Sequence, residues 1–541
     1  MSAPAANIAA RLAERAREHP GKAAVVEHDR TRSFAELEAC VERLACGLES
    51  VGITRGAKAA LMVRPSFEFF ALTFALFRAG AVPVMVDPGM GRQHLGECLD
   101  EAAPRAFIGI PLAHLGRWMF GWAKHTIETL VTVGPTWFWG GETLESLSRS
   151  KPPRHPDVAP DDVAAILFTS GSTGVPKGAV YTHRIFSTQV DMLIRDFGMG
   201  PADVDVPTFP LFALFDAALG ATAVIPRMDF TRPAQVDPRE ILGCVRRNGA
   251  TQMFGSPALL DRVGRYGQAS REKLPSLRRV ITAGAPVPPA TLERFATMLA
   301  PGALIHTPYG ATEALPVASI DHTEILGETR DASARGRGTC VGRPLPGLDV
   351  RVIRISDAPY PRWSDDLVVP AGEVGEIAVR GGIATAEYYG RPQATALAKI
   401  PVDGGGFYHR MGDLGYQDAQ GRLWFCGRKS HRVVGPAGTL FTIPCEAIFN
   451  QHPRVKRTAL VGVGAPGHQR PVLCVELDRD KRGARSDHAT VERELLALGA
   501  AHDHTRAITA VLFHDAFPVD VRHNSKIFRE KLAAWAAELL P

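Results

Sequence analysis

Apolar runs and amphipathic stretches alternate along residues 1–335 of the chain. Runs such as VAAILFT (residues 163–169) and ATAVIP (residues 221–226) have the length and branched side chains of buried strands. PREILGCVRRNGA (residues 238–250) and PATLERFATMLA (residues 289–300) instead repeat apolar residues at helical spacing. The alternation predicts βα units around mostly parallel sheets, which is an α/β fold.

The pattern changes near Gly336, where short strands punctuated by glycine and proline replace the βα alternation. Segments such as GLDVRVIRI and GEIAVRG predict a smaller antiparallel or barrel-like subdomain. Beyond Arg428 a further unit combines predicted strands (TALVGVG, PVLCVEL, ITAVLFHD) with predicted helices (ERELLALGA, SKIFREKLAAWAAELL). This unit is long enough to fold separately. We therefore expect two domains, residues 1–428 and residues 429–541, with the second a small mobile α+β lid.

Two long apolar segments lack the character of membrane-spanning helices. Residues 67–86 include Glu68 and Arg78, and residues 209–226 include Asp216 together with proline near both ends. A spanning helix needs about 20 consecutive apolar residues. We expect a core helix followed by a strand in the first segment, a buried helix or pocket wall in the second, and no transmembrane segment.

Composition narrows the class of protein further. The 541 residues include 62 Lys and Arg against 57 Asp and Glu, a net charge of +5 without a basic block, which argues against nucleic-acid binding. The eight cysteines show no CxxC or zinc spacing, which is typical of a protein kept reduced in the cytoplasm. For a cluster of tryptophans, a place in the core is favoured over a surface that meets a partner or lipid. These are Trp118, Trp122, Trp137 and Trp139.

A loop rich in serine, threonine and glycine follows the predicted strand at residues 163–169 and ends at a lysine. Glycine lets a backbone approach an anion closely, hydroxyls and N–H groups donate hydrogen bonds to its oxygens, and lysine supplies charge. Lys177 precedes Gly178, so the GxxxxGK[ST] order of a Walker A loop is absent. We predict a phosphate-binding loop made by Thr169, Ser170, Gly171, Ser172, Thr173, Gly174 and Lys177.

Five motifs, in order along the chain, resemble those of one enzyme family. TSGSTGVPKG resembles the signature of the acyl-adenylate-forming (ANL) superfamily, which includes acyl-CoA synthetases, luciferases and the adenylation domains of peptide synthetases. The other matches are YGATE, GDL, GR and NSKI, which begin at Tyr309, Gly412, Gly427 and Asn524. The resemblance implies an AMP-forming ligase that uses ATP and Mg²⁺, with a large N-terminal adenylation domain and a C-terminal lid.

The resemblance also implies a role for each matching residue. Glu313, with Thr169, would hold Mg²⁺ against the phosphates, and Thr312 would donate to the phosphates together with the predicted loop. Asp413 would accept both ribose hydroxyls, with Arg428 nearby. The remaining nucleotide contacts, including the adenine slot, would come from Gly284, Ala285, Pro286, Tyr309, Gly310 and Ala311.

In the family, a lysine of the C-terminal domain reaches across the cleft and bridges the carboxylate and the phosphate during adenylation. The matching residue here is Lys526, although the family usually has glycine directly before this lysine. Asn524 tolerates a left-handed turn as glycine does. Lys531 is a competing candidate, but its helical surroundings indicate a solvated face. The catalytic residues implied are Lys526, Glu313 and Thr312.

The step after adenylation differs among these enzymes, and this chain departs from the thioester-forming pattern. The hinge position is Ser430, the position of the second-step lysine is Val434, and Ala213 replaces the histidine of the PLFH motif. These changes argue against transfer to CoA. YGATEALP, GTLFTIPCEAIF and FPVDVRHNSKIF instead resemble the β-lactone synthetases of bacterial long-chain olefin biosynthesis.

The β-lactone synthetases activate a 2-alkyl-3-hydroxy fatty acid as its adenylate. The β-hydroxyl of the substrate then closes a four-membered lactone and releases AMP, and this internal nucleophile makes the step effectively unimolecular. Two alkyl chains require a large apolar cavity. The candidate lining residues, which as aromatic and apolar side chains could equally fill the core, are Phe209, Phe212, Phe215, Phe254 and Met253.

Two other functions remain open from the sequence. A long-chain fatty acyl-CoA or acyl-AMP ligase would share every nucleotide residue and differ in its product. A nucleotide-binding scaffold that has lost turnover is disfavoured because Glu313, Asp413 and Lys526 are all present. The resemblance implies, as possible partners, an α/β-hydrolase-type β-lactone decarboxylase and an NADPH-dependent reductase of the same pathway.

Overall fold

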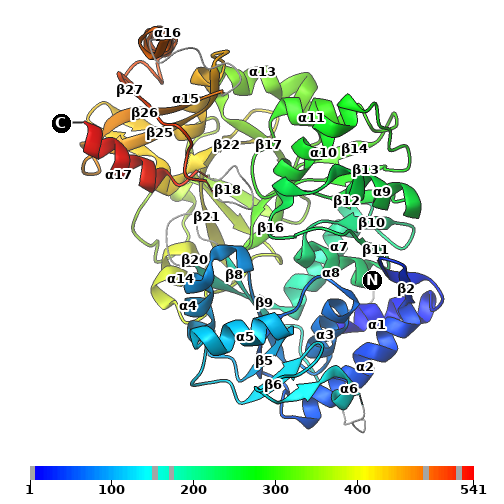
Figure 1. The fold of residues 1–541 in the computed structure, drawn as a ribbon. Helices are drawn as coiled ribbons and strands as arrows, with labels where there is room; N and C mark the ends of the chain where they lie inside the picture. Colours follow the sequence, from blue (N-terminus) through cyan, green and yellow to red (C-terminus); the bar gives the residue numbers. More distant parts are fainter. Residues whose placement is uncertain (1–6, 149–155, 170–175, 479–486, 520–526, 541) are drawn as a thin grey trace.

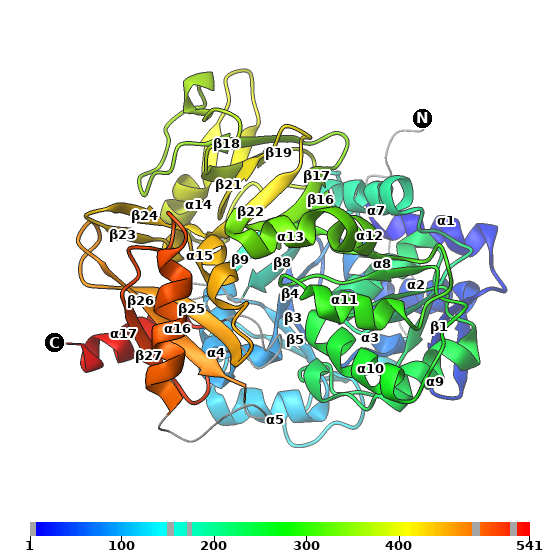
Figure 2. The same cartoon turned by 90° about the horizontal axis from the view of Figure 1, so that it is seen from above.

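Two large sheets, an antiparallel sheet and a C-terminal unit make up the molecule (Figures 1 and 2). The structure, a computed structural model, describes residues 7–148, 156–169, 176–478, 487–519 and 527–540. The predicted α/β class with mostly parallel sheets and a smaller C-terminal unit is confirmed. Among the described residues, no helix is both long enough and apolar enough to cross a bilayer.

The first seven-stranded sheet has the order β7-β6-β5-β3-β4-β8-β9, and every neighbouring pair is parallel except β8 with β9. Its inner strands are mostly apolar because one face packs on α2 (Phe34–Ser50) and α3 (Phe67–Arg78) and the other on α4 (Arg92–Ala102). The strands are β3 (Lys58–Met62), β4 (Val82–Val86), β5 (Ala106–Gly109), β6 (Thr129–Thr132), β7 (Glu142–Thr143), β8 (Val163–Thr169) and β9 (Lys177–Thr182).

The second seven-stranded sheet has the order β14-β13-β12-β10-β11-β1-β2 and is parallel except for the hairpin of β1 and β2. The chain therefore begins in this sheet, builds the first sheet, and then returns. The strands are β1 (Ala23–Glu27), β2 (Arg30–Ser33), β10 (Val204–Pro207), β11 (Thr222–Ile225), β12 (Gln252–Phe254), β13 (Arg279–Ile281) and β14 (Leu304–His306).

Helices cover both large sheets. The helix predicted within residues 67–86 is present as α3, where the Ser66 side chain accepts a hydrogen bond from the N–H of Phe69 and caps the first turn. Residues 209–226 form α8 and then β11, as expected for a buried segment. The helices of these two layers are α1 (Ala9–Glu18), α2 (Phe34–Ser50), α3 (Phe67–Arg78), α4 (Arg92–Ala102), α5 (Pro111–Phe120), α6 (Leu144–Leu147), α7 (His183–Phe197), α8 (Pro210–Leu219), α9 (Pro238–Asn248), α10 (Pro257–Ala269) and α11 (Pro289–Ala296).

The tryptophan cluster is only partly in the core, so the expectation of core placement is wrong for two of its members. Trp122 is buried and Trp139 is half-buried, but Trp118 and Trp137 are exposed. The hydropathy of an aromatic residue does not reveal which face of a helix or loop it occupies, and here α5 points part of its apolar surface outward.

An antiparallel sheet of short strands follows, and it begins at Tyr309, earlier than the change of pattern near Gly336 indicates. Its order is β15-β16-β17-β22-β21-β19-β18, with β20 paired to β21. The elements are β15 (Tyr309–Ala311), β16 (Ala314–Ser319), α12 (His322–Glu324), α13 (Arg330–Ala332), β17 (Thr339–Pro344), β18 (Asp349–Ile353), β19 (Gly375–Arg380), α14 (Pro392–Ala398), β20 (Lys399–Pro401), β21 (Phe407–Gln417) and β22 (Leu423–Arg428).

The C-terminal unit has cores of its own and sits against the antiparallel sheet (Figure 1). It contacts the helical turn Ser333–Arg337, where the Gln451 side chain donates a hydrogen bond to the carbonyl oxygen of Ala334 (2.6 Å). The elements are β23 (Val433–Gly435), β24 (Gly438–Leu440), α15 (Thr442–Phe449), β25 (Val455–Val463), β26 (Arg470–Leu477), α16 (His488–Ala500), β27 (Ala510–Phe513) and α17 (Arg529–Leu539). The division at residues 428 and 429 stays a prediction.

Candidate active site

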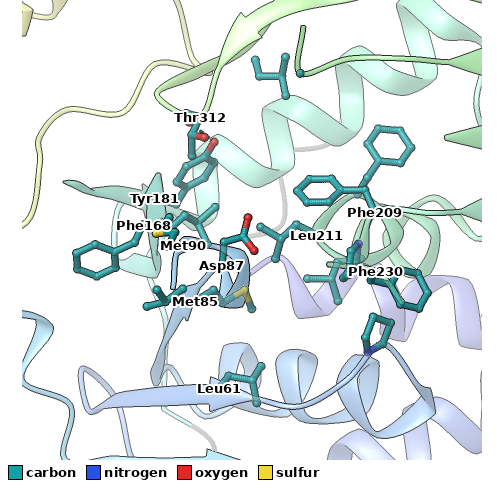
Figure 3. Close-up of a pocket in the computed structure, with 18 of the residues that line it drawn as sticks. Leu61, Met85, Asp87, Met90, Phe168, Tyr181, Phe209, Leu211, Phe230 and Thr312 are labelled. Carbon is teal, nitrogen blue, oxygen red and sulfur yellow. Dashed lines mark hydrogen bonds between the residues drawn. The ribbon is translucent and has the colours of Figure 1, made fainter. Parts of the chain in front are cut away.

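A cavity of about 1930 Å³ lies between the two parallel sheets and the antiparallel sheet. Ligand pockets in proteins usually have about 300–1,000 Å³, so this cavity has room for more than one small molecule. One end is polar and contains Thr312 and Glu313, and the other is apolar and contains Phe209 and Phe230. Figure 3 shows Thr312 and Tyr181 on one side and these phenylalanines on the other.

The polar end is built on the short link between β15 and β16, which carries Thr312 and Glu313. The Glu313 Oε1 atom accepts a hydrogen bond from the hydroxyl of Tyr388 (2.7 Å). The backbone is fixed as well, because the Glu313 carbonyl accepts from the N–H of Thr385 (2.8 Å) and the Thr312 carbonyl accepts from the hydroxyl of Tyr181. The carboxylate therefore has a defined orientation in the cavity wall.

Behind Glu313 lies a buried basic pair that the sequence motifs do not indicate. Lys399 contacts Nδ1 of His409 with its Nζ atom (3.1 Å) and lies 5.9 Å from the ring centroid of Tyr388. Burial lowers the pKa of Lys399 to about 7, and burial together with the nearby lysine holds the pKa of His409 well below its usual range. This pair joins β20 to β21 directly beneath Tyr388, the residue that orients Glu313.

The ends of the predicted phosphate loop are held together by the hairpin of β8 and β9. Thr169 and Lys177 pair across the two strands. Lys177 lines the cavity, with its Nζ atom 5.1 Å from the ring centroid of Tyr388. The predicted loop residues Ser170, Gly171, Ser172, Thr173 and Gly174 lie outside the described residues.

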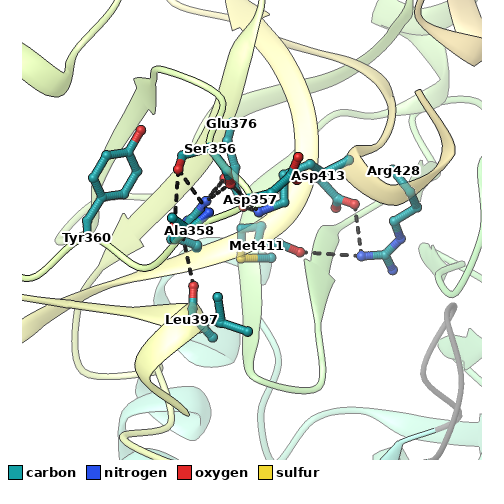
Figure 4. Close-up of polar contacts among 12 residues, drawn as sticks. Ser356, Asp357, Ala358, Tyr360, Glu376, Leu397, Met411, Asp413 and Arg428 are labelled. Atoms are coloured by element: carbon teal, nitrogen blue, oxygen red, sulfur yellow. Dashed lines mark hydrogen bonds and ion pairs between the residues drawn. The ribbon is translucent and has the colours of Figure 1, made fainter. Parts of the chain in front are cut away.

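Asp413 and Arg428 are direct cross-strand partners in β21 and β22. The Arg428 guanidinium lies 2.8 Å from Asp413 Oδ1 (Figure 4). The Tyr309 hydroxyl donates to Asp413 Oδ2 (2.7 Å). Burial raises the pKa of Asp413, while the charge of Arg428 opposes this rise. Three residues predicted from separate motifs are thus brought into one contact group.

A second buried ion pair lies beside this group and reaches the predicted domain boundary. The Arg410 Nη2 atom is 2.6 Å from Glu376 Oε2, and both side chains are almost fully buried. Lys429 contacts the same carboxylate (3.2 Å). Arg410 also donates to the carbonyl oxygens of Ala358 and Leu397 (2.9 and 3.1 Å) (Figure 4). Lys429, the first residue after β22, therefore contacts the antiparallel sheet through its side chain. The next residue, Ser430 at the predicted hinge position, lines the cavity.

The other predicted residues divide into three sets. One set does not line the cavity: it consists of Tyr309, Asp413 and the two residues Ala285 and Pro286 in the turn after β13. Lys526 lies outside the described residues. The predicted residues that line the cavity are Lys177, Gly284, Gly310, Ala311, Thr312, Glu313 and Arg428.

The apolar end contains four of the five residues predicted for it. The ring centroids of Phe212 and Phe254 are 4.7 Å apart, and those of Phe209 and Phe254 are 5.8 Å apart. Phe215 also lines the cavity. Met253 takes the other alternative that the sequence left open: it is buried in the core of the second sheet, because alternate strand residues face opposite sides.

Sequence reasoning missed the lining contributed by the first sheet and its helices. Leu61, Met85 and Phe74 reach the cavity from β3, β4 and α3, and Phe186 reaches it from α7. No motif marks these positions, because each is one apolar residue within an ordinary core pattern. Only the meeting of separate sheets identifies them as lining residues.

Comparison with known proteins places these features in one family. A family model described as AMP-binding enzyme matches residues 12–389. The chain belongs to the AMP-binding enzymes. This AMP-binding enzyme is 53% identical to an olefin beta-lactone synthetase of Xanthomonas campestris pv. campestris, with 98% of each chain covered. It is 51% identical to an olefin beta-lactone synthetase of Stenotrophomonas maltophilia at the same coverage.

A solved structure agrees with the fold over nearly the whole chain. The amide bond synthetase McbA of Marinactinospora thermotolerans superposes with a TM-score of 0.80 and 25% identity, covering 98% of this chain and 99% of the other. The membership in the ANL superfamily that the motifs predict is therefore confirmed.

Proposed function

We propose that this AMP-binding enzyme is an ATP-dependent β-lactone synthetase. In the first step a 2-alkyl-3-hydroxy fatty acid and ATP form the acyl-AMP and pyrophosphate. In the second step the β-hydroxyl oxygen of the substrate attacks the acyl carbon, the bond from that carbon to the phosphate oxygen breaks, and AMP leaves as the hydroxyl proton is lost. The product is a four-membered lactone.

The observation that carries this proposal is the similarity to olefin beta-lactone synthetases at 53% and 51% identity along the whole chain. The cavity supports it. About 1930 Å³ of space runs from Glu313 and Thr312 to a wall of phenylalanines, as an acid with two alkyl chains requires. Burying each methylene of those chains contributes about 0.8 kcal/mol to binding.

In the adenylation step two anions meet, so charge neutralisation and alignment should dominate catalysis. We assign Lys177 and Arg428, which line the cavity, to the phosphates and the ribose side of the nucleotide. Thr312 would donate to phosphate, and the assignments of Thr169, the rest of the loop and Lys526 follow from the sequence motifs alone. Asp413, whose Oδ2 atom accepts a hydrogen bond from the Tyr309 hydroxyl, is assigned to the ribose hydroxyls from its motif.

A single carboxylate such as Glu313 is sufficient as the protein ligand of Mg²⁺. No group of three or more His, Cys, Asp or Glu side chains that could hold a metal occurs among the described residues. Mg²⁺, however, usually keeps several waters and binds through one or two carboxylates together with substrate phosphates. When bound, it would neutralise phosphate charge. The hydrogen bond from the Tyr388 hydroxyl fixes the orientation of the Glu313 carboxylate that would bind Mg²⁺.

The second step needs no CoA, because the nucleophile is part of the substrate. The replacements Ser430 and Val434 at positions used by thioester-forming relatives agree with this. A reductase that uses NADPH would supply the β-hydroxy acid, and an α/β-hydrolase-type decarboxylase would consume the lactone. We place the enzyme in the cytoplasm, where its eight free cysteines would stay reduced.

The product of the reaction tests the proposal. A synthetic 2-alkyl-3-hydroxy fatty acid, ATP and Mg²⁺ are incubated with the enzyme, with and without CoA, and extracted products are identified by NMR because heating converts a β-lactone into an alkene. We expect one AMP per β-lactone, independent of CoA. Acyl-CoA formed only when CoA is present would identify an acyl-CoA ligase instead.

The Lys526→Ala variant tests whether the protein is an enzyme or a nucleotide-binding scaffold without turnover. We expect this variant to lose ATP–pyrophosphate exchange by about 100-fold or more, because the positive charge that bridges the two anions is removed. Lys531→Ala is the matched control, since Lys531 is exposed and its Nζ atom lies 5.0 Å from the ring centroid of Phe528. Equal loss in both variants would contradict the assignment of Lys526.

A further inference from the structure

An exposed apolar surface lies on α5 and on the loop between β6 and β7. Trp118 is 61% exposed and Phe138 is 64% exposed. Helix α5 lies at the edge of the molecule in both views (Figures 1 and 2). Six of the eleven large apolar side chains that are strongly exposed among the described residues gather here, a concentration that marks an interaction surface. The members of this α5 patch are Leu112, Trp118, Met119, Phe120, Trp137 and Phe138.

The aromatic members of the α5 patch rest on a rigid base. The ring centroids of Trp118 and Phe138 are 5.1 Å apart, and Phe138 is 5.2 Å from Trp139. Trp139 stacks on His114 (5.3 Å), a buried side chain whose Nε2 atom contacts the carbonyl oxygen of Val131 (3.0 Å). The outward position of these rings is therefore fixed by packing beneath them.

The charges within the α5 segment have one sign. Residues 110–127 include Arg117 and Lys124 and no Asp or Glu. Arg92, at the start of α4, adds a further cation, with its guanidinium 5.4 Å from the ring centroid of Phe120. Aromatic side chains bordered by Lys and Arg are typical of proteins that lie on anionic lipid surfaces.

The carboxylates next to this segment are engaged by neighbouring groups. Glu128 forms an ion pair with Arg105 (2.5 Å), and Asp100 accepts a hydrogen bond from the N–H of Ala123 (2.8 Å). The attraction of the patch for an anionic surface is therefore only partly offset by these acids.

The patch is continuous with the large cavity. Leu112 is 64% exposed and also lines the cavity. Arg92, which contacts Phe120, lines it as well. The cavity thus reaches the surface beside the exposed aromatic side chains, so a lipid held at the patch has an apolar route inward.

We propose that the α5 patch docks on the surface of an anionic lipid bilayer and that water-insoluble acyl chains enter the cavity from that surface. The aromatic rings insert at the level of the headgroups, and the neighbouring cations contact lipid phosphates. The entry route rests on the proposed function, because it needs a long-chain acid as the substrate. Docking itself does not depend on the reaction.

Vesicle sedimentation tests the docking with the full chain. The wild type is compared with the W118S/W137S/F138S variant on vesicles of phosphatidylcholine alone and of phosphatidylcholine mixed with phosphatidylglycerol. The matched control is I194S/V368S/L539S, which removes three exposed apolar side chains elsewhere. We expect the patch variant to lose about tenfold or more in its partition coefficient on anionic vesicles. The control should bind as the wild type does, and added salt should weaken binding.

Turnover of a short-chain, water-soluble 3-hydroxy acid is measured on the same three proteins, and we expect it to be equal. Vesicle binding by a protein that makes no lactone would leave docking intact and remove the proposed function. Equal vesicle binding by the wild type and the patch variant, or none by either, would overturn the docking. Self-association of the wild type that the patch variant loses, without vesicle binding, would also overturn it and identify a second copy of the chain as the occupant.

Discussion

Tyr388 contacts both Glu313 in the cavity wall and the buried Lys399. It donates to Glu313, and its ring centroid lies 5.1 Å from the Nζ atom of Lys177 and 5.9 Å from that of Lys399. As the proposed Mg²⁺ ligand, Glu313 needs its rotamer fixed before the substrate arrives. We therefore regard Tyr388 as a positioning residue.

The Tyr388→Phe variant should keep its fold and lose part of its adenylation rate. A hydrogen bond to a charged group is worth about 1.5–3 kcal/mol, so we expect kcat for ATP–pyrophosphate exchange to fall by about 10- to 100-fold. The Mg²⁺ concentration for half-maximal rate should rise as well. Both are measured by exchange of labelled pyrophosphate over a Mg²⁺ titration.

Tyr389→Phe is the matched control for this prediction, because the hydroxyl of Tyr389 contacts Lys58 and not Glu313. An unchanged Mg²⁺ dependence in Tyr388→Phe would show that the hydrogen bond does not orient the metal ligand.

At the scale of elements, β10 and α8 bury two carboxyl groups against each other. Asp205 and Asp216 are both fully buried. Burial raises the pKa of Asp205 to about 7. Burial, with the charge of Asp205, raises the pKa of Asp216 well above its usual range. The nearest charges that modify this pair include Asp203 and Lys22. Packing an apolar helix on a sheet here places both acids in the core.

This pair should make stability depend on pH in a defined direction. A carboxyl whose pKa is raised on folding gives its full stabilisation below the unfolded value of about 3.9 and loses it as pH rises through the folded value. The free energy of unfolding should therefore fall as the pH rises from about 4 to about 7, and Asp216, whose pKa is raised well above its usual range, should extend the fall to higher pH. Asp216→Asn should reduce that fall by about 1–4 kcal/mol, as measured by urea unfolding across this range.

Asp331→Asn, at an exposed carboxylate outside this pair, is measured over the same pH range as the control. A pH profile for Asp216→Asn that parallels the wild type would refute the raised pKa of this pair.

At the scale of the whole molecule, the C-terminal unit has a core separate from those of the two large sheets. Glu446 is central to it. Its carboxylate lies 2.7 Å from the Arg529 guanidinium and accepts from the N–H of Leu460 (2.8 Å). Glu446 is buried, and the side chain of Arg529 is 13% exposed. Because the cores are separate, we expect damage in this unit to stay largely local.

Glu446→Ala should destabilise the C-terminal unit by about 3–5 kcal/mol, because it leaves the largely covered guanidinium of Arg529, whose Nε atom is buried, without its carboxylate partner. Hydrogen exchange followed by mass spectrometry should show faster exchange in β25, β26 and β27 and unchanged exchange in β3, β4 and β8. Asp503→Ala, which removes an exposed ion pair with Arg506, should cost about 1 kcal/mol or less and serves as the control. Faster exchange in both regions would mean that the two units unfold together.

The amino-acid sequence by itself determined the α/β class and the superfamily, and it singled out seven residues that the structure places on the cavity wall. These features are local: a strand runs into a Ser/Thr/Gly loop that ends at Lys177, and YGATE places Thr312 and Glu313 side by side in the chain. Residues that are adjacent in the chain stay adjacent in the fold, so a short motif determines which functional groups lie together.

The tertiary structure alone decided which distant residues complete the site and which apolar residues face outward. Tyr388 lies 75 positions from the Glu313 it orients, Met253 packs in the core and Phe254 beside it lines the cavity, and Trp118 faces solvent. The sequence shows which residues are apolar and with what period they repeat along the chain. It does not define which sheet each face packs against, because that choice is made by contacts between segments far apart in the chain.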